Sequence, residues 1–439
     1  DFEEDIDTVL DTTLDPEDII IPDQYGTVIE THRGTNGKLI IHIQDAHCNY
    51  EGQMNEAYIL EVLMEDYDLN LVLSESKLTD RDFKYIRPWL TADKRKEVAD
   101  NLVKDGYITG VDYVDLSTDY PFVNQGIEDK ELYDSNRDAL WELDKYKVVA
   151  GEYIDEMIIA ANTVKPSIYT DDLLELDSKK KAYDTEEIDL LEYYEYLYKT
   201  AENNEIPLYT FPNFQNLIKA SELEKKIDLT KVRDGSATDE EMDLYSEYLE
   251  ATRDLNINEL FKEEPLLEDV VQDTLAVNYD QRKLLRVSKA LSIVRNLLKI
   301  KIVPEEYRHF MDNEKDFDPM FWSAFLKEKS SELNFSLDIP NNYQIINDTL
   351  PKVKNFYKLA ADREKVFLSR TQKQMTDRGV DFAALIAGGF HTPTLTDLLA
   401  DAGYSYIVVS PKVTTETDEE LYRWALKMDW IPELKGGEI

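Results

Sequence analysis

The sequence predicts an α/β protein: a mostly parallel β-sheet is built from the N- and C-terminal parts, and a large helical insertion occupies the middle. Near both ends of the chain, short apolar runs rich in β-branched residues alternate with segments of helical periodicity. Between them, roughly residues 130–330 are rich in Glu, Leu, Lys and Tyr and have helical periodicity over most of their length. The 439 residues suffice for two or three structural units, or for one domain with a large insertion.

The first half of the sheet is predicted from three strands. Residues 38–43 and 69–73 are short and apolar, as buried strands are, and residues 51–67 between them have apolar side chains at helical spacing. This order of strand, helix and strand is typical of a βαβ unit with parallel strands. Residues 120–127 predict a third strand, which leads into the polar residue Glu128.

The second half of the sheet is predicted near the C-terminus. Residues 351–378 predict a helix, and the apolar run at 382–387 predicts a strand that ends in a tight turn with two glycines. Residues 394–402 predict a short helix, and residues 404–409 predict a final strand. The two ends of the chain therefore complete one sheet.

The middle of the chain is predicted to be helical, without a repeat of fixed period. Helical periodicity covers residues 131–163, 186–204, 214–227, 238–262, 265–299 and 318–333. The tyrosine-rich run at 193–198 is interpreted as core and half-exposed helix faces. The predicted organisation comprises an acidic, irregular N-terminal segment (1–37), two halves of an α/β core (38–130 and 351–412), a helical insertion or subdomain (131–350) and a C-terminal tail (413–439).

The net charge restricts the partners of the protein. The chain has 49 Lys and Arg residues against 91 Asp and Glu residues, a formal charge of −42. Such a field repels a phosphate backbone and an anionic lipid surface, so we expect no nucleic-acid partner. No apolar stretch reaches the length of about 18 residues typical of a membrane helix, so we expect no membrane span.

The chain opens with Asp1 and contains one cysteine, Cys48. A start without Met is consistent with a processed, exported chain, located in the periplasm, at the cell surface or outside the cell. It is equally consistent with a shortened chain, and a cytoplasmic location stays open. A single cysteine excludes an intrachain disulfide and a cysteine-rich metal site.

Notable polar residues follow three of the predicted strands. Asp45 and His47 follow the first strand, Glu75 follows the second, and His391 follows the two glycines after the strand at 382–387. Ligand sites in open α/β sheets form beyond the carboxyl ends of the strands. The chain has only five histidines, so two at such positions are informative. His42 lies inside the first strand and is interpreted as a buried structural residue.

Two histidines and two carboxylates are suitable ligands for a divalent metal such as Zn, Mn, Fe or Co. We therefore predict a metal held by Asp45, His47, Glu75 and His391. The metal would lower the pKa of a bound water and supply hydroxide near neutral pH. Glu75 could instead stay off the metal and act as a general base.

Each of these residues also has a simpler structural interpretation. Asp45 could cap the helix that follows it, because Asp accepts backbone N–H bonds well at that position. His47 could be an ordinary loop histidine, and Glu75 could pair with an arginine. His391 could be a neighbour of a helix N-cap after a tight turn.

At these residues the chain resembles the TIKI/TraB, erythromycin-esterase and ChaN-like superfamily. Members open with a strand that runs into a Gly-Glu-x-His or Gly-Thr-x-His motif, which is similar to Ile43-Gln-Asp-Ala-His47. In this chain Gln44 stands in the place of the family's glycine, and Asp45 stands where the family often has Glu. A second family strand ends in a glutamate, as Leu71-Val-Leu-Ser-Glu75 does.

The C-terminal motif is the most specific part of the resemblance. The family's Gly-x-x-His motif, with its following helix and strand, resembles Gly388-Gly-Phe-His391 and the segment that continues to residue 409. The family tends to place an arginine on the preceding helix, and Arg363 matches that place, with Arg370 as the reserve. The resemblance implies that Glu75, Arg363 and His391 are catalytic, with Arg363 suited to a substrate anion or a developing oxyanion.

Three functions remain open at this stage. The first is a metal-dependent hydrolase that acts on a peptide or ester bond, with a peptide or small molecule as substrate. The second is a binding protein of the ChaN type, with haem or another ligand as cofactor. The third is an exported structural or assembly protein on a decayed enzyme scaffold, which would form a homo-oligomer or an extracellular assembly. Superfamily membership implies a pocket and leaves the reaction undecided.

Overall fold

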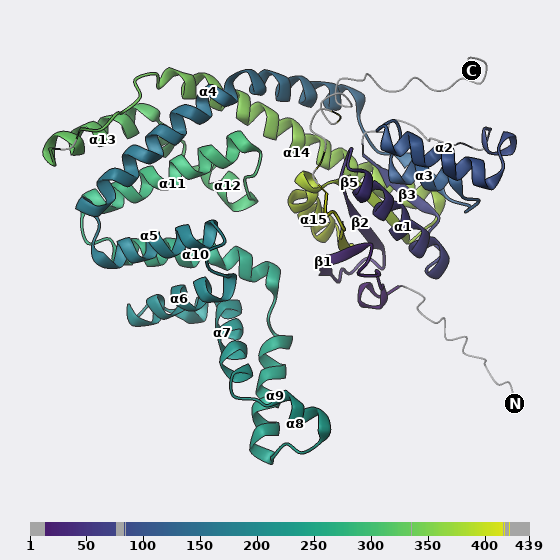
Figure 1. Ribbon diagram of the computed structural model, residues 1–439, viewed down its shortest axis with the longest axis horizontal. Coiled ribbons are helices and arrows are strands. Elements are labelled where there is room, and N and C mark those ends of the chain that lie inside the picture. The colour runs from purple at the N-terminus through teal and green to yellow at the C-terminus, as the bar shows by residue number, and fades with distance from the viewer. Residues whose placement is uncertain are drawn as a thin grey trace, which may run out of the picture. The chain divides into compact units, whose positions relative to one another are not determined.

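The computed structural model describes residues 14–75, 83, 85–334, 336–415, 417 and 421. Most of the predicted C-terminal tail and the first thirteen residues lie outside this range. The chain divides into two compact units (Figure 1). The first, here called the α/β unit, contains Asp1–Lys145 and Pro351–Ile439, and the second, here called the helical unit, contains Tyr146–Leu350.

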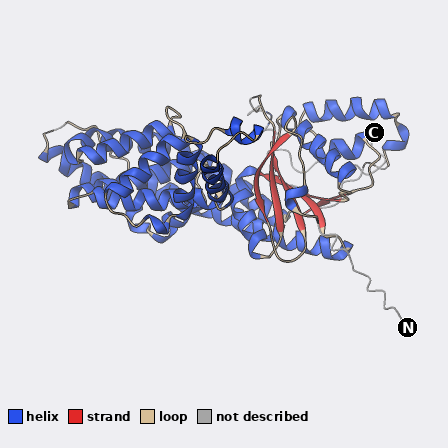
Figure 2. Ribbon diagram, turned by 90° about the horizontal axis from the view of Figure 1, so that it is seen from below, coloured by secondary structure: helices blue, strands red, loops and turns tan. Residues whose placement is uncertain are grey.

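A six-stranded sheet forms the centre of the α/β unit, and its strands are red in Figure 2. The strand order is β1-β6-β2-β5-β3-β4. All neighbours are parallel except β1 and β6. The strands are β1 (Gly26–His32), β2 (Leu39–Asp45), β3 (Leu71–Ser74), β4 (Val123–Gly126), β5 (Phe382–Gly388) and β6 (Ser405–Pro411). The predicted α/β class, with a mostly parallel sheet from the two ends of the chain, is therefore confirmed.

Helices cover both faces of the sheet. The alternation of side chains along β2 sends Ile41 and Ile43 to one face, where they pack with residues of α1, α2 and α3. It sends Ile40 to the opposite face, where it packs with residues of α14 and α15. These helices are α1 (Tyr50–Asp66), α2 (Ala92–Lys104), α3 (Gly110–Ser117), α14 (Gln344–Arg378) and α15 (Thr392–Asp401). Because both faces are buried, the central strands are almost wholly apolar.

The prediction that residues 1–37 are irregular is wrong for β1. Gly26–His32 forms an antiparallel edge strand against β6, with a register shift between Val28 and Glu30. Four of its seven residues are exposed, so the strand carries neither a buried apolar run nor a clear alternation. An edge strand held mainly by its backbone ladder leaves little pattern in the sequence.

The helical unit consists of helices joined by short connections. They are the C-terminal part of α4 (Lys130–Ile168), α5 (Asp171–Asp184), α6 (Leu190–Asn203), α7 (Pro212–Glu224), α8 (Leu229–Asp234), α9 (Asp239–Arg253), α10 (Ile257–Leu275), α11 (Tyr279–Lys299), α12 (Pro304–Asp312), α13 (Pro319–Glu332) and the start of α14. The segment predicted as one helix over 265–299 is divided between α10 and α11, because Asn278 caps the start of α11. Tyr193 and Tyr194 are fully buried, as predicted for this tyrosine-rich run.

Among the residues that the structure describes, none of the helices combines the length and the apolar character that a bilayer span requires.

Candidate functional site

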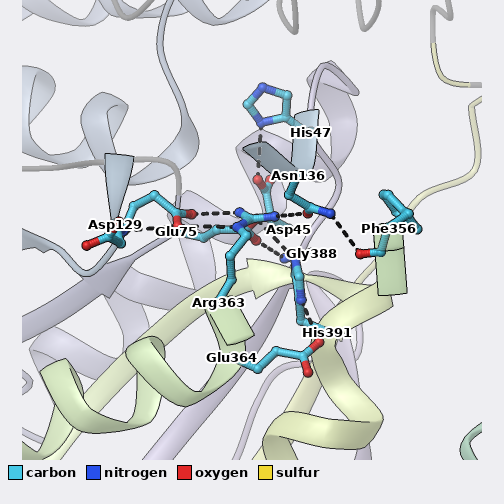
Figure 3. A network of polar contacts seen from close by, with 11 residues as sticks. Asp45, His47, Glu75, Asp129, Asn136, Phe356, Arg363, Glu364, Gly388 and His391 are labelled. Atoms are coloured by element: carbon cyan, nitrogen blue, oxygen red, sulfur yellow. Dashed lines mark hydrogen bonds and ion pairs between the residues drawn. The ribbon is translucent and has the colours of Figure 1, made fainter. Parts of the chain in front are cut away.

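The carboxyl ends of β2, β5 and β3 lie side by side in the sheet and bring distant parts of the chain together. In the ladder between β2 and β5, Asp45 lies opposite Gly388. Beyond β3, the backbone N–H of Glu75 donates to the carbonyl of Ile386 at 2.8 Å. Polar side chains from three strand ends therefore meet at one edge of the sheet (Figure 3).

Glu75 is held from three directions. Its Oε2 accepts a hydrogen bond from the backbone N–H of Gly388 at 2.8 Å. Its Oε1 lies 2.7 Å from Nη2 of Arg363 and 3.4 Å from Nε2 of His391. Burial alone would raise the pKa of Glu75, but His391, Arg363 and the Gly388 N–H outweigh burial and hold the pKa far below its usual range. Glu75 is therefore a carboxylate at neutral pH.

His391 lies in the short 3₁₀ turn Gly389–His391 between β5 and α15. Its Nδ1 donates to Oε1 of Glu364 at 2.8 Å, and its Nε2 faces Glu75. The rings of Phe367 and Phe390 meet the imidazole edge to face. Burial would lower the pKa of His391, but Glu75 and Glu364 raise it to about 9. The buried imidazole is therefore protonated at neutral pH.

Arg363 of α14 donates to side chains of this cluster with all three of its nitrogens. Nε and Nη2 reach the two oxygens of Glu128 at 3.2 and 2.6 Å, and Nη2 also reaches Glu75. Nη1 donates to Oδ1 of Asn136 at 3.0 Å. Arg370, the reserve choice, donates instead to Oδ2 of Asp129 at 3.2 Å and to the carbonyl of Glu128. Arg363, the residue chosen from the sequence, is therefore the one that contacts Glu75.

Asp45 and His47 form a second imidazole–carboxylate pair. His47 Nδ1 lies 3.2 Å from Oδ2 of Asp45, and Gln53 donates to Oδ1 of Asp45 at 2.5 Å. Partial burial opposes a charge on His47, but the hydrogen bond to Asp45 raises its pKa well above its ordinary value. The His47 side chain is 36% exposed, against 5% for His391. The helix that follows is capped by Asn49, whose side chain accepts from Gly52 N, so Asp45 remains available to His47.

His42 is fully buried inside β2, as the sequence predicts. Its Nδ1 lies 3.2 Å from the carbonyl of Leu385, which can only accept, so Nδ1 carries the proton. Its Nε2 then accepts from the hydroxyl of Thr392 at 2.9 Å. Gln44 also donates to that hydroxyl, at 3.1 Å. Burial lowers the pKa of His42 to about 4, so this imidazole is neutral.

The predicted metal ligands are brought together as two pairs, Asp45 with His47 and Glu75 with His391. A metal-binding histidine often has a carboxylate on its second nitrogen, as His391 has Glu364. However, Arg363 and the Gly388 N–H already occupy the two oxygens of Glu75. Within the described part of the chain, no group of three or more His, Cys, Asp or Glu side chains is arranged to hold a metal ion. As placed, the donors do not fit one ion bound by all four residues.

Four residues of the cluster were missing from the sequence-based selection: Glu128, Asn136, Gln53 and Glu364. Glu128 follows β4, so the same strand-end argument that selected Glu75 could have found it. Glu364 is adjacent to Arg363, but helical periodicity alone does not show which neighbour faces a histidine 27 residues away. Asn136 and Gln53 lie on α4 and α1, where a single polar residue carries no distinct signal.

In comparisons with protein-family models, curated proteins and solved structures, none matches this chain. The resemblance to the TIKI/TraB, erythromycin-esterase and ChaN-like superfamily therefore stays an expectation that rests on the motifs alone.

Proposed function

We propose that the α/β unit is a hydrolase that cleaves a peptide or ester bond at the carboxyl edge of its sheet. One observation carries the proposal: two imidazole–carboxylate pairs, Asp45 with His47 and Glu75 with His391, lie at the ends of neighbouring strands. A histidine oriented by a carboxylate is the usual arrangement for proton transfer during acyl transfer. Buried charged groups of this kind are concentrated at functional sites.

The environments of the two histidines support different roles. His391, with a pKa of about 9, is protonated at neutral pH and suits a general acid or a stabiliser of developing negative charge. His47 is partly exposed and is oriented by Asp45, so it suits proton exchange with substrate or water. Arg363 contributes by holding Glu75. A divalent metal stays a prediction from the strand-end pattern, and none of these roles depends on it.

The test is hydrolysis of a panel of p-nitrophenyl esters and peptide p-nitroanilides by the purified full chain. We expect His391→Ala, Glu75→Gln and His47→Ala each to lower kcat/KM by roughly 10²- to 10⁴-fold, the usual contribution of acid–base catalysis. His309→Ala is the matched control, because the contacts of His309 are with Asn313 and Phe317, which are not part of the proposed site. No turnover above the blank, or equal turnover in the site variants and the control, would overturn the proposal.

Further measurements on the same protein test the metal-dependent hydrolase, the ligand-binding protein and the assembly protein. If EDTA abolishes turnover and added Zn²⁺, Mn²⁺ or Co²⁺ restores it, the metal-dependent form of the prediction is supported. A Soret band on titration with haem, without hydrolysis, would replace the hydrolase by the ligand-binding function. Concentration-dependent growth in particle size, again without hydrolysis, would favour the assembly protein.

A further inference from the structure

Five side chains, four of them buried, form a continuous row at the site, and acidic and basic groups alternate along it. The order is Glu128, Arg363, Glu75, His391 and Glu364. Successive members are 2.6, 2.7, 3.4 and 2.8 Å apart. Most of the row can be followed in Figure 3. Each basic group therefore lies between two carboxylates, and Glu75 is the central member.

The ends of the row are closed off from solvent, whereas its centre is not. The side chains of Glu128 and Glu364 are 0% and 4% exposed, and that of Glu75 is 16% exposed. Glu75 is therefore partly accessible from solvent, whereas Glu364 is not. Any contribution of Glu364 to the chemistry must therefore pass through His391.

We propose that Glu364 is a positioning residue for His391, an inference that rests on the proposed function and deepens it. An imidazole has two nitrogens and could turn either one toward Glu75. Because the Glu364 carboxylate can only accept, it accepts from Nδ1–H and fixes the ring in the orientation that directs Nε2 at Glu75. Arg363 and Glu364 are consecutive on α14, so one helix carries both the group that pairs with Glu75 and the group that pairs with His391. A site on a regular helix is held more rigidly than one on a loop.

A purely structural role is the competing explanation, since buried ion pairs are common without catalytic meaning. The two explanations differ in what a conservative substitution does. Glu364→Gln keeps an oxygen that can accept from Nδ1–H, whereas Glu364→Leu removes the acceptor. Glu128→Gln is the matched control, because it alters an equally buried carboxylate that pairs with Arg363.

The test is NMR of the full chain with its five histidines selectively labelled with ¹³C and ¹⁵N. We expect a downfield, slowly exchanging Nδ1 proton on His391 in the wild type, in Glu364→Gln and in Glu128→Gln, and its loss in Glu364→Leu. The His391 signals are identified by single substitution of each of the five histidines in turn. An Nδ1 proton absent from the wild type, or unchanged in Glu364→Leu, would overturn the inference. The wild-type spectrum alone suffices if a variant does not fold.

Kinetics provide a second readout wherever the hydrolysis panel gives turnover. We expect Glu364→Leu to lower kcat by about 10- to 100-fold with little change in KM, the usual effect of losing such a partner, and Glu364→Gln to recover most of it. Equal kcat in the wild type and Glu364→Leu would overturn the inference. Because the NMR readout needs no substrate, it supports or rejects the role of Glu364 even if no hydrolysis is found.

Discussion

Single residues in this protein show that partners, as well as burial, decide the charge of a histidine. His42 and His391 are both buried and lie close in space on the same side of the sheet, yet their pKa values move in opposite directions. His42 meets a carbonyl and a hydroxyl, which do not compensate a buried positive charge. His391 meets Glu75 and Glu364, which do. The carboxylates therefore distinguish the charged histidine of the proposed site from the neutral histidine inside the strand.

His42 makes stability depend on pH. Its pKa of about 4 in the folded protein lies below the ordinary value of 6.5, so the unfolded chain binds the extra proton as the pH falls. We expect the stability contribution to be lost progressively from about pH 6.5 down to about pH 4. Between pH 6.5 and 4.5 the loss is about 2 kcal/mol.

The measurement is urea denaturation of the wild type and of His42→Gln at both pH values. Contributions from other groups are common to the two proteins, so the difference between their pH dependences isolates residue 42. His42→Gln should lose about 2 kcal/mol less than the wild type on acidification. Parallel pH dependences would contradict the neutral state of the buried imidazole.

At the scale of elements, close packing between helices determines which substitutions the fold tolerates. α3 begins at Gly110, and a Cβ atom added there would lie 2.3 Å from the carbonyl oxygen of Gln53 on α1. The same glycine donates its N–H to the side chain of Gln53, whose amide supports Asp45. In contrast, a Cβ added at Gly151 of α4 would meet nothing within 4 Å.

Alanine at these two glycines should therefore change stability in opposite directions. We expect Gly110→Ala to destabilise the protein by about 1–3 kcal/mol, because the methyl group forces α1 and α3 apart. We expect Gly151→Ala to stabilise it by up to about 1 kcal/mol, because alanine favours a helix interior more than glycine does. Urea denaturation followed by circular dichroism measures both changes. A shift of the same sign in both variants would contradict this packing.

For the whole molecule, the dominant property is the net charge of −42. Like charges repel one another more in the compact state than in an expanded chain, so the charge destabilises the folded protein. Salt shortens the range of this repulsion, from about 10 Å in 0.1 M salt to about 3 Å in 1 M salt. The buried pairs around Glu75 are screened much less than the surface charges.

We therefore expect the Tm to rise between 0.1 M and 1 M NaCl. The rise should be about 2–4 °C for each kcal/mol of relieved repulsion in units of this size. Choline chloride is the control, since general screening gives the same rise whereas specific Na⁺ binding does not. A Tm that stays constant or falls in NaCl would show that surface repulsion is not a main determinant of stability.

The site residues that could be predicted from the sequence lie at the ends of strands. Asp45, His47, Glu75 and His391 could be selected because parallel strands direct their carboxyl ends to one edge. Their pairing could not be predicted, since Glu75 and Gly388 are 313 positions apart and meet only through the ladder. The contact of Glu364 with His391 depends on the rotation of α14 about its own axis, and the sequence motifs do not encode that rotation.

The sequence by itself determined the α/β class, the buried strands and the helical middle, because burial on one or both faces imposes an apolar period that a local window shows. The tertiary structure alone decided the exposed edge strand β1, the row of alternating charges and the protonated state of His391. These features arise from strand register and helix packing between segments far apart in the chain. A local pattern records which faces of an element are buried, and it does not record which side chains meet there.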